Sequence, residues 1–198
     1  MSNRRPGVLA LLLCAVLATG ACSGGDEPEA KPTKTSASPT PTVPVQPQGE
    51  FGVTYDVGNW DDYADDQEKL PVILAYKNVI EAAHGSVNQG KLLPQVRASM
   101  TRAGQRQVLP VLRRALSNKW TLPAKAEGRV LSVRGSGSTR TLTMCEVMKS
   151  ISYLKPDGNF VVKPQGSKQT VIKLSKTGSV WKFSGVKLGK SCQNGGGE

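Results

Sequence analysis

Few residues of this 198-residue chain could perform acid–base, metal or nucleophilic chemistry. The chain holds a single histidine, His84, and no Cys-x-x-Cys or His-x-x-x-His spacing, so the usual ligand pattern of a zinc site is missing from the sequence. Cys145 could act as a catalytic thiolate only with an activating base, and His84 is the one imidazole on offer. We therefore expect no catalytic residue, no metal and no cofactor, and the chain is too short for a multidomain enzyme.

Carboxylates are scarce in the C-terminal two-thirds of the chain. Among the five acids after residue 68, only Glu81, Glu127 and Glu146 could face a pocket, because Asp157 lies in a turn signal and Glu198 is the last residue. Tyr76 and Trp120 are the candidates for lining an interior cavity. These residues form no convincing acid–base constellation, but a small-molecule carrier or an enzyme that uses such a cavity is the alternative to a non-enzymatic domain.

A dense acidic cluster precedes the first predicted helix. Calcium binding is one interpretation, because hard cations take several carboxylate oxygens, although the spacing lacks the order of an EF-hand loop. The other interpretation is a solvated entry into the helix, with the nearest acids placed favourably at the positive end of its dipole. The cluster consists of Asp56, Asp61, Asp62, Asp65, Asp66 and Glu68.

Charge is distributed very unevenly along the chain. Residues 50–68 carry a formal charge of −7, whereas residues 69–198 carry +17. We expect a basic outer face on the strands, with Lys173, Lys176 and Lys182 as its candidate residues. The other strand-borne bases that could contribute to this face are Arg129, Arg134, Arg140, Lys163, Lys168 and Lys187. Anionic cell-wall polymers or phospholipid head groups are the expected partners and nucleic acid is not, while the alternative is that these lysines only keep the sheet soluble.

The first 22 residues have the features of an export signal. Arg4 and Arg5 precede an apolar run of eleven residues, Val8–Ala18, which is shorter than the roughly 20 residues that span a bilayer. The following residues, Leu17-Ala18-Thr19-Gly20-Ala21-Cys22, resemble the lipobox of bacterial lipoproteins. The resemblance implies that Cys22 is lipidated and that the protein is anchored on the outer face of the cytoplasmic membrane. The alternative is an ordinary secretory signal that is cut near Ala21.

The cysteines divide according to this leader. Cys14 leaves with the signal peptide and Cys22 takes the lipid, which leaves Cys145 and Cys192 as a pair in an oxidising compartment. We expect these two to form a disulfide. The domain boundaries that follow are a signal peptide at 1–21, a disordered Pro/Ser/Thr-rich tether at 22–49, one domain at 50–192 and a flexible Gly-rich tail at 193–198.

Hydrophobic periodicity predicts helices followed by strands. Apolar residues at helical spacing predict helices over 70–84, ended by Gly85, and over about 91–100 and 103–118, with a kink at Pro110. Residues 50–68 are expected to be irregular, and His84 is expected to lie in the cap region of its helix. From residue 125 onward the apolar residues alternate, beginning with Leu131 and Val133, and turn signals stand at 135–138, 157–158 and 177–178. The fold class is α+β, with N-terminal helices packed on a curved antiparallel sheet.

This order of elements resembles the small NTF2-like domains of actinobacterial lipoproteins. The residues that carry the resemblance in the second half of the chain are Gly128-Arg129-Val130, Cys145 and Ser179-Val180-Trp181-Lys182-Phe183. The resemblance implies a cone in which helices cap a curved sheet, and it implies no activity, because that fold serves many functions. We therefore expect a membrane-tethered, extracytoplasmic binding or interaction domain of unknown ligand.

Overall fold

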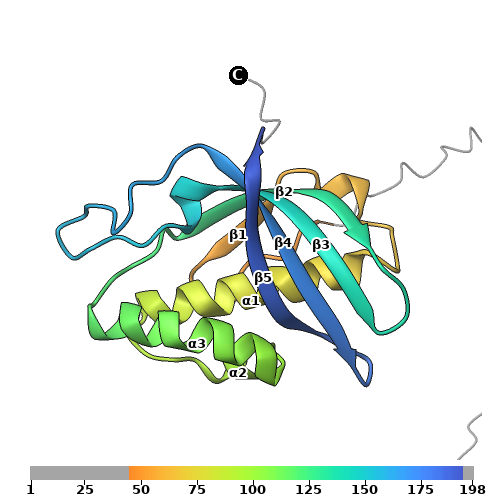
Figure 1. Cartoon of the computed structure of the whole chain (residues 1–198), viewed down its shortest axis with the longest axis horizontal. Helices are drawn as coiled ribbons and strands as arrows, with labels where there is room; N and C mark the ends of the chain where they lie inside the picture. The colour runs from red at the N-terminus through yellow and green to blue at the C-terminus, as the bar shows by residue number, and fades with distance from the viewer. Residues whose placement is uncertain (1–44, 194–198) are drawn as a thin grey trace, which may run out of the picture. The chain divides into compact units, whose positions relative to one another are not determined.

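The computed structural model describes residues 45–193. It is a mixed α+β domain whose mostly antiparallel five-stranded sheet is covered on one face by helices (Figure 1). The expected signal sequence, the expected lipidation residue Cys22 and most of the expected tether lie outside the described residues, as do residues 194–198 of the expected tail. No helix in the described part of the chain is long and apolar enough to cross a membrane.

Helix α1, Leu70–Asn88, is the long helix beneath the sheet. It begins where Asp66 accepts hydrogen bonds on its carboxylate from the backbone N–H groups of Glu68 and Lys69, which satisfies donors that a helix start leaves free. The helix continues past Gly85, so the predicted end at that glycine is wrong. A Cβ at position 85 would collide with the side chain of Phe51. Gly85 is there for close packing and not for termination.

Two further helices follow. Helix α2 covers only Pro94–Ala98, so the expected helix over 91–100 is shorter than predicted, and it starts at a proline, which suits a first turn. Helix α3, Arg102–Ser117, matches its prediction closely and contains Pro110. Thr101 caps it by accepting a hydrogen bond on its hydroxyl oxygen from the Gly104 N–H, at 3.2 Å.

The strands lie in the order β1-β2-β3-β4-β5, with bounds Thr54–Val57, Lys125–Arg134, Thr139–Val147, Ser167–Thr177 and Val180–Cys192. All neighbours are antiparallel except β1 and β2, which are parallel. The predicted hairpins at 135–138 and 177–178 are confirmed. Asp157-Gly158 also turns the chain back on itself, between Leu154 and Phe160, which form an isolated antiparallel bridge in the loop before β4.

Two local predictions about the sheet are wrong. Residues 50–68 were expected to be irregular, yet Thr54–Val57 forms β1, because a four-residue edge strand gives too little alternation to be seen. Leu131 was expected to point inward with Val133. A bulge between Val130 and Ser132 shifts the alternation, so Val130 is buried and Leu131 is 40% exposed.

A glutamine side chain covers part of each edge of the sheet. At β1, Gln46 donates to the Tyr55 carbonyl and accepts from the Val57 N–H, at 2.7 and 3.2 Å. At β5, Gln107 does the same for the carbonyl and N–H of Val186, at 2.7 and 3.0 Å. Each amide occupies strand positions that a further strand would otherwise use. Gln46 makes these contacts from within the segment expected to be tether.

Candidate functional site: the outer face of the sheet

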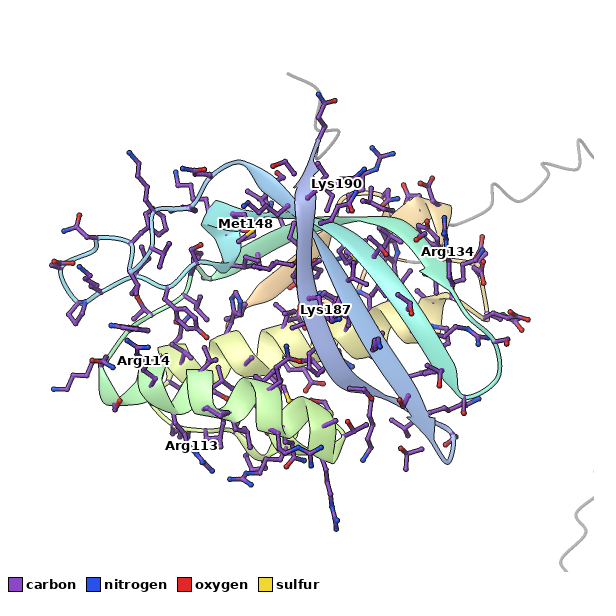
Figure 2. The ribbon with its side chains drawn as sticks, viewed as in Figure 1. Arg113, Arg114, Arg134, Met148, Lys187 and Lys190 are labelled. Carbon is purple, nitrogen blue, oxygen red and sulfur yellow. A yellow bond between two sulfur atoms is a disulfide. The ribbon has the colours of Figure 1, made fainter. Side chains whose placement is uncertain are left out.

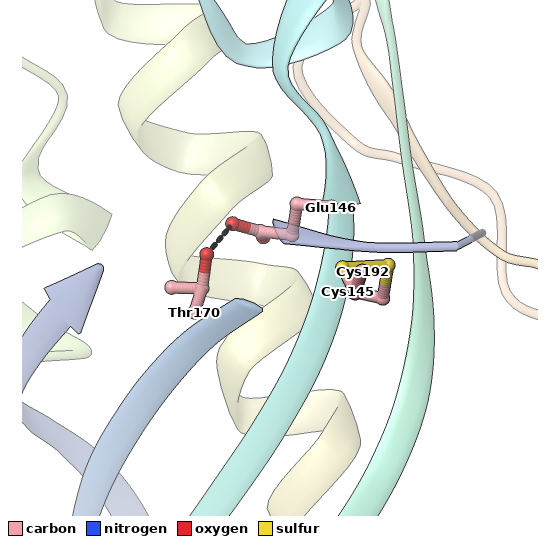
Figure 3. Close-up of a disulfide and its surroundings, with 4 residues drawn as sticks. All are labelled: Cys145, Glu146, Thr170 and Cys192. Atoms are coloured by element: carbon pink, nitrogen blue, oxygen red, sulfur yellow. Dashed lines mark hydrogen bonds between the residues drawn. A yellow bond between two sulfur atoms is a disulfide. The ribbon is translucent and has the colours of Figure 1, made fainter. Parts of the chain in front are cut away.

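The most buried acid of the domain is Glu146 on β3, which is 1% exposed. Its carboxyl accepts hydrogen bonds from the hydroxyls of Tyr55 at 3.0 Å, Tyr76 at 2.6 Å and Thr170 at 2.5 Å; Figure 3 shows the last of these. Burial raises the pKa of Glu146, and the three hydroxyl donors oppose that rise. A Cβ on Gly128 would collide with the Tyr55 hydroxyl, so this glycine makes the cluster possible.

The candidates for cavity lining lie within packed surroundings. Tyr76 is 3% exposed and its ring packs edge-on against Tyr55, with centroids 5.8 Å apart. Trp120 packs against Tyr153 at 5.7 Å and lies beneath the Arg114 guanidinium, also at 5.7 Å. Buried apolar side chains from α1, α3 and the inner face of the sheet form one continuous core around Tyr76. The carboxyl of Glu146 therefore makes its three hydrogen bonds with side chains inside the protein.

A buried ion pair holds the edge strand to helix α1. Lys77 pairs with Glu81, and both are almost fully buried. Lys77 also donates to the Tyr55 carbonyl at 2.8 Å, and the Tyr55 N–H donates to Glu81 at 2.8 Å. Of the acids that the sequence singled out, Glu81 thus anchors β1, whereas Glu127 lies on β2 and pairs with Lys125.

His84 lies inside α1 and is 4% exposed, so its expected cap position is wrong. Its ring makes a hydrogen bond to the Pro123 backbone, while Nδ1 has no hydrogen-bond partner among the described residues. Burial lowers its pKa to about 4. The imidazole is therefore neutral at physiological pH.

The acidic cluster before α1 does not converge on a common point. Asp56 pairs with Lys125 at 3.2 Å and Asp66 pairs with Lys69 at 2.7 Å. Within residues 45–193 no group of three or more metal-ligating side chains is placed to hold an ion. The position of Asp66 at the start of α1 agrees with the helix-entry interpretation.

The predicted disulfide between Cys145 and Cys192 is confirmed, with the two Cα atoms 6.0 Å apart. It joins β3 to the end of β5, two strands that β4 separates in the sheet (Figure 3). The end of β5 is otherwise exposed from Lys187 to Ser191. The bond fixes this projecting strand end to the centre of the sheet.

The outer face of the sheet gathers bases from three strands. Strand register places Arg134, Thr141 and Lys173 in one row across β2, β3 and β4; Lys182 lies in the row on one side and Lys187 in the row on the other. Rows two residues apart are separated by roughly 7 Å. Strands β4 and β5 together hold six lysines and no acid. Figure 2 shows the side chains of Arg134 and Lys187 on their strands.

Hydroxyl groups lie between these bases. Thr141 and Thr143 on β3 share the face, and Ser184 donates to Ser175 at 2.8 Å. None of Arg134, Lys173, Lys182 and Lys187 makes an ion pair with another described residue. The face, which we call the outer basic face, therefore presents free cations and hydrogen-bonding hydroxyls together.

One residue of the expected basic face is misplaced. Lys176 pairs in register with Trp181, whose ring is buried, and its ammonium lies 5.9 Å from that ring. Lys173 and Lys182 lie on the other side of the sheet, so Lys176 does not belong with them. Arg134 and Lys187, two of the further strand-borne bases that the sequence offered, do lie with Lys173 and Lys182, and the strand register makes them neighbours.

The structure thus defines an α+β domain with one continuous apolar core and a basic sheet face. No family model matches the sequence, and no curated protein matches it. The solved structure of a function-unknown protein from Mycobacterium tuberculosis is similar, with a TM-score of 0.39 and 17% sequence identity, over 65% of this chain and 77% of that one. A likeness this weak carries no argument about function.

Proposed function

We propose that this chain is a lipid-anchored, extracytoplasmic binding protein without catalytic activity, whose NTF2-like domain holds anionic cell-envelope material against the outer basic face. The observation that carries the proposal is the row arrangement of Arg134, Lys173, Lys182 and Lys187 with no described acid paired to them. The sequence resemblance at Leu17–Cys22 supports the anchor.

The geometry of the outer basic face suits an extended polyanion better than a small compact ligand. Its cations stand on neighbouring rows of a sheet, so they present charge along a surface and not around a point. Attraction of this kind depends on long-range electrostatics and weakens as salt screens it. The intervening hydroxyls can donate hydrogen bonds to phosphate or carboxylate oxygens.

The test is binding of the full chain to polyphosphate and to polyglutamate at two salt concentrations. Replacing Lys173, Lys182 and Lys187 together by Gln should weaken binding about tenfold at low salt, through the loss of three favourable charge contacts. The matched control replaces Lys91, Lys119 and Lys155 by Gln, which removes the same charge from exposed positions elsewhere. Equal weakening by both triple variants would show that only net charge matters and would reject the face.

A further inference from the structure

The helical part of the domain contains a second concentration of positive charge. Residues 82–126 include no Asp or Glu and eight bases, of which five are arginines between positions 97 and 114. Lysine dominates strands β4 and β5, whereas arginine dominates this stretch. The difference has chemical meaning, because the planar guanidinium offers paired donors that match two oxygens of one phosphate, and the lysine ammonium does not.

Three of these arginines lie on one flank of α3. Arg102, Arg106 and Arg113 are spaced four and seven residues apart, which places them within about 40° of one another around the helix. All three are exposed, and together with Gln105, Leu109 and Pro110 they line a hollow of about 430 Å³. Figure 2 shows Arg113 extending from α3 on the side away from the sheet.

The position of these arginines is unfavourable for the helix itself. Arg102 and Arg106 stand in the first turns of α3, where the helix dipole is positive, and that first turn holds no acid. None of the three makes an ion pair with a described residue. Their mutual repulsion and the dipole both oppose the gathering of these charges on one flank, although arginine itself is a good helix former.

We propose that this flank of α3 is a binding site for a phosphate group. The guanidinium groups of Arg102 and Arg106, one helical turn apart, would share the oxygens of one phosphate, and Arg113, about 10 Å further along the helix, would contact a second anionic group of the ligand. Gln105 would add an amide donor, and Leu109 and Pro110 would contact the apolar part of the ligand. The site lies in the helix layer, apart from the outer basic face, and does not rest on the proposed function.

The first experiment titrates the full chain with inorganic pyrophosphate by calorimetry, with citrate as a carboxylate control. Replacing Arg102, Arg106 and Arg113 by Lys keeps the charge but removes the paired donors, and should weaken pyrophosphate binding at least about tenfold. The matched variant Lys173→Gln, Lys182→Gln, Lys187→Gln should change it less than about threefold. Equal affinity of wild type and the Arg→Lys variant would overturn the proposal, and so would equal binding of citrate.

The second experiment identifies the source of the phosphate. One arm uses soluble glycerol 3-phosphate and the other uses vesicles of phosphatidylglycerol, each with wild type and with the Arg→Lys variant. The N-terminal apolar segment contributes equally to both proteins, so the difference between them reports the site. A difference in the soluble arm assigns a free phosphate compound, and a difference only with vesicles assigns a lipid head group. No difference in either arm would overturn the proposal.

Discussion

At the scale of single residues, the carboxyl of Glu146 depends on hydroxyls from three different elements. Tyr55 comes from β1, Tyr76 from α1 and Thr170 from β4, so the acid joins the helix to three strands. Glu146 stood out as an acid in the sequence, but its partners lie 91, 70 and 24 residues away. Only folding of the chain brings these residues together, so no sequence pattern could reveal the cluster.

Removing one hydroxyl from this cluster should destabilise the domain. We expect Thr170→Val, which keeps the shape, to lower the free energy of unfolding by about 1–3 kcal/mol, because the buried Oε2 of Glu146 then loses the hydroxyl that donates to it. Urea denaturation at pH 7 measures the change. Thr170→Ser retains the hydroxyl and should lose less. Equal stability of Thr170→Val and wild type would contradict this role.

His84 should make stability depend on acid pH. Folding lowers the pKa of His84 from 6.5 to about 4. Well above pH 6.5 the ring is neutral in both the folded and the unfolded chain, so it causes no loss of stability there. Between pH 6.5 and pH 4 the ring is protonated in the unfolded chain but not in the folded one. The free energy of unfolding therefore falls as pH drops, by about 3 kcal/mol over the whole range.

The measurement compares urea denaturation of wild type and His84→Gln between pH 7 and pH 4. Glu146 acts in the opposite direction, because its raised pKa gives stability that is lost as pH rises. Both proteins share that contribution, so their difference isolates His84. Parallel curves for wild type and His84→Gln would show that the ring does not contribute.

At the scale of elements, the disulfide holds the end of β5 to β3. It encloses a sequence separation of 47 residues, for which the loop-entropy model gives about 4 kcal/mol of stabilisation. We expect reduction to lower the thermal midpoint with little change in far-UV circular dichroism, since the strands keep their other contacts. Titration of the freed thiols provides the control. An unchanged midpoint with both thiols free would refute the stabilising role.

The sequence predicted those elements whose pattern is long and regular. Helix α3 and the hairpins at 135–138 and 177–178 followed from apolar spacing and turn residues. Failures arose where tertiary packing overrides local pattern: Gly85 lies inside a helix because Phe51 packs on it, and Leu131 is displaced by a bulge. In the candidate site, Lys173 and Lys182 lie on one face of the sheet and Lys176 on the other, because Lys173 and Lys176 are three residues apart on one strand, where side chains alternate between the two faces.

At the scale of the whole molecule, the opposite charges stay apart. Of the seven acids in residues 50–68, Asp56 and Asp66 pair with lysines, and both pairs are partly exposed to solvent. The acidic segment therefore leaves the outer basic face and the arginine flank of α3 uncompensated. An anionic surface would repel the acidic segment and attract the two basic regions.

The glutamines on the two sheet edges affect self-association of the domain at high local concentration. Anchoring on a membrane would concentrate the domains in two dimensions, and unpaired strand edges at high density are templates for fibrous assembly. Here Gln46 and Gln107 occupy the backbone groups that an incoming strand from a neighbouring copy would need. The two glutamines thus oppose strand addition at Tyr55, Val57 and Val186.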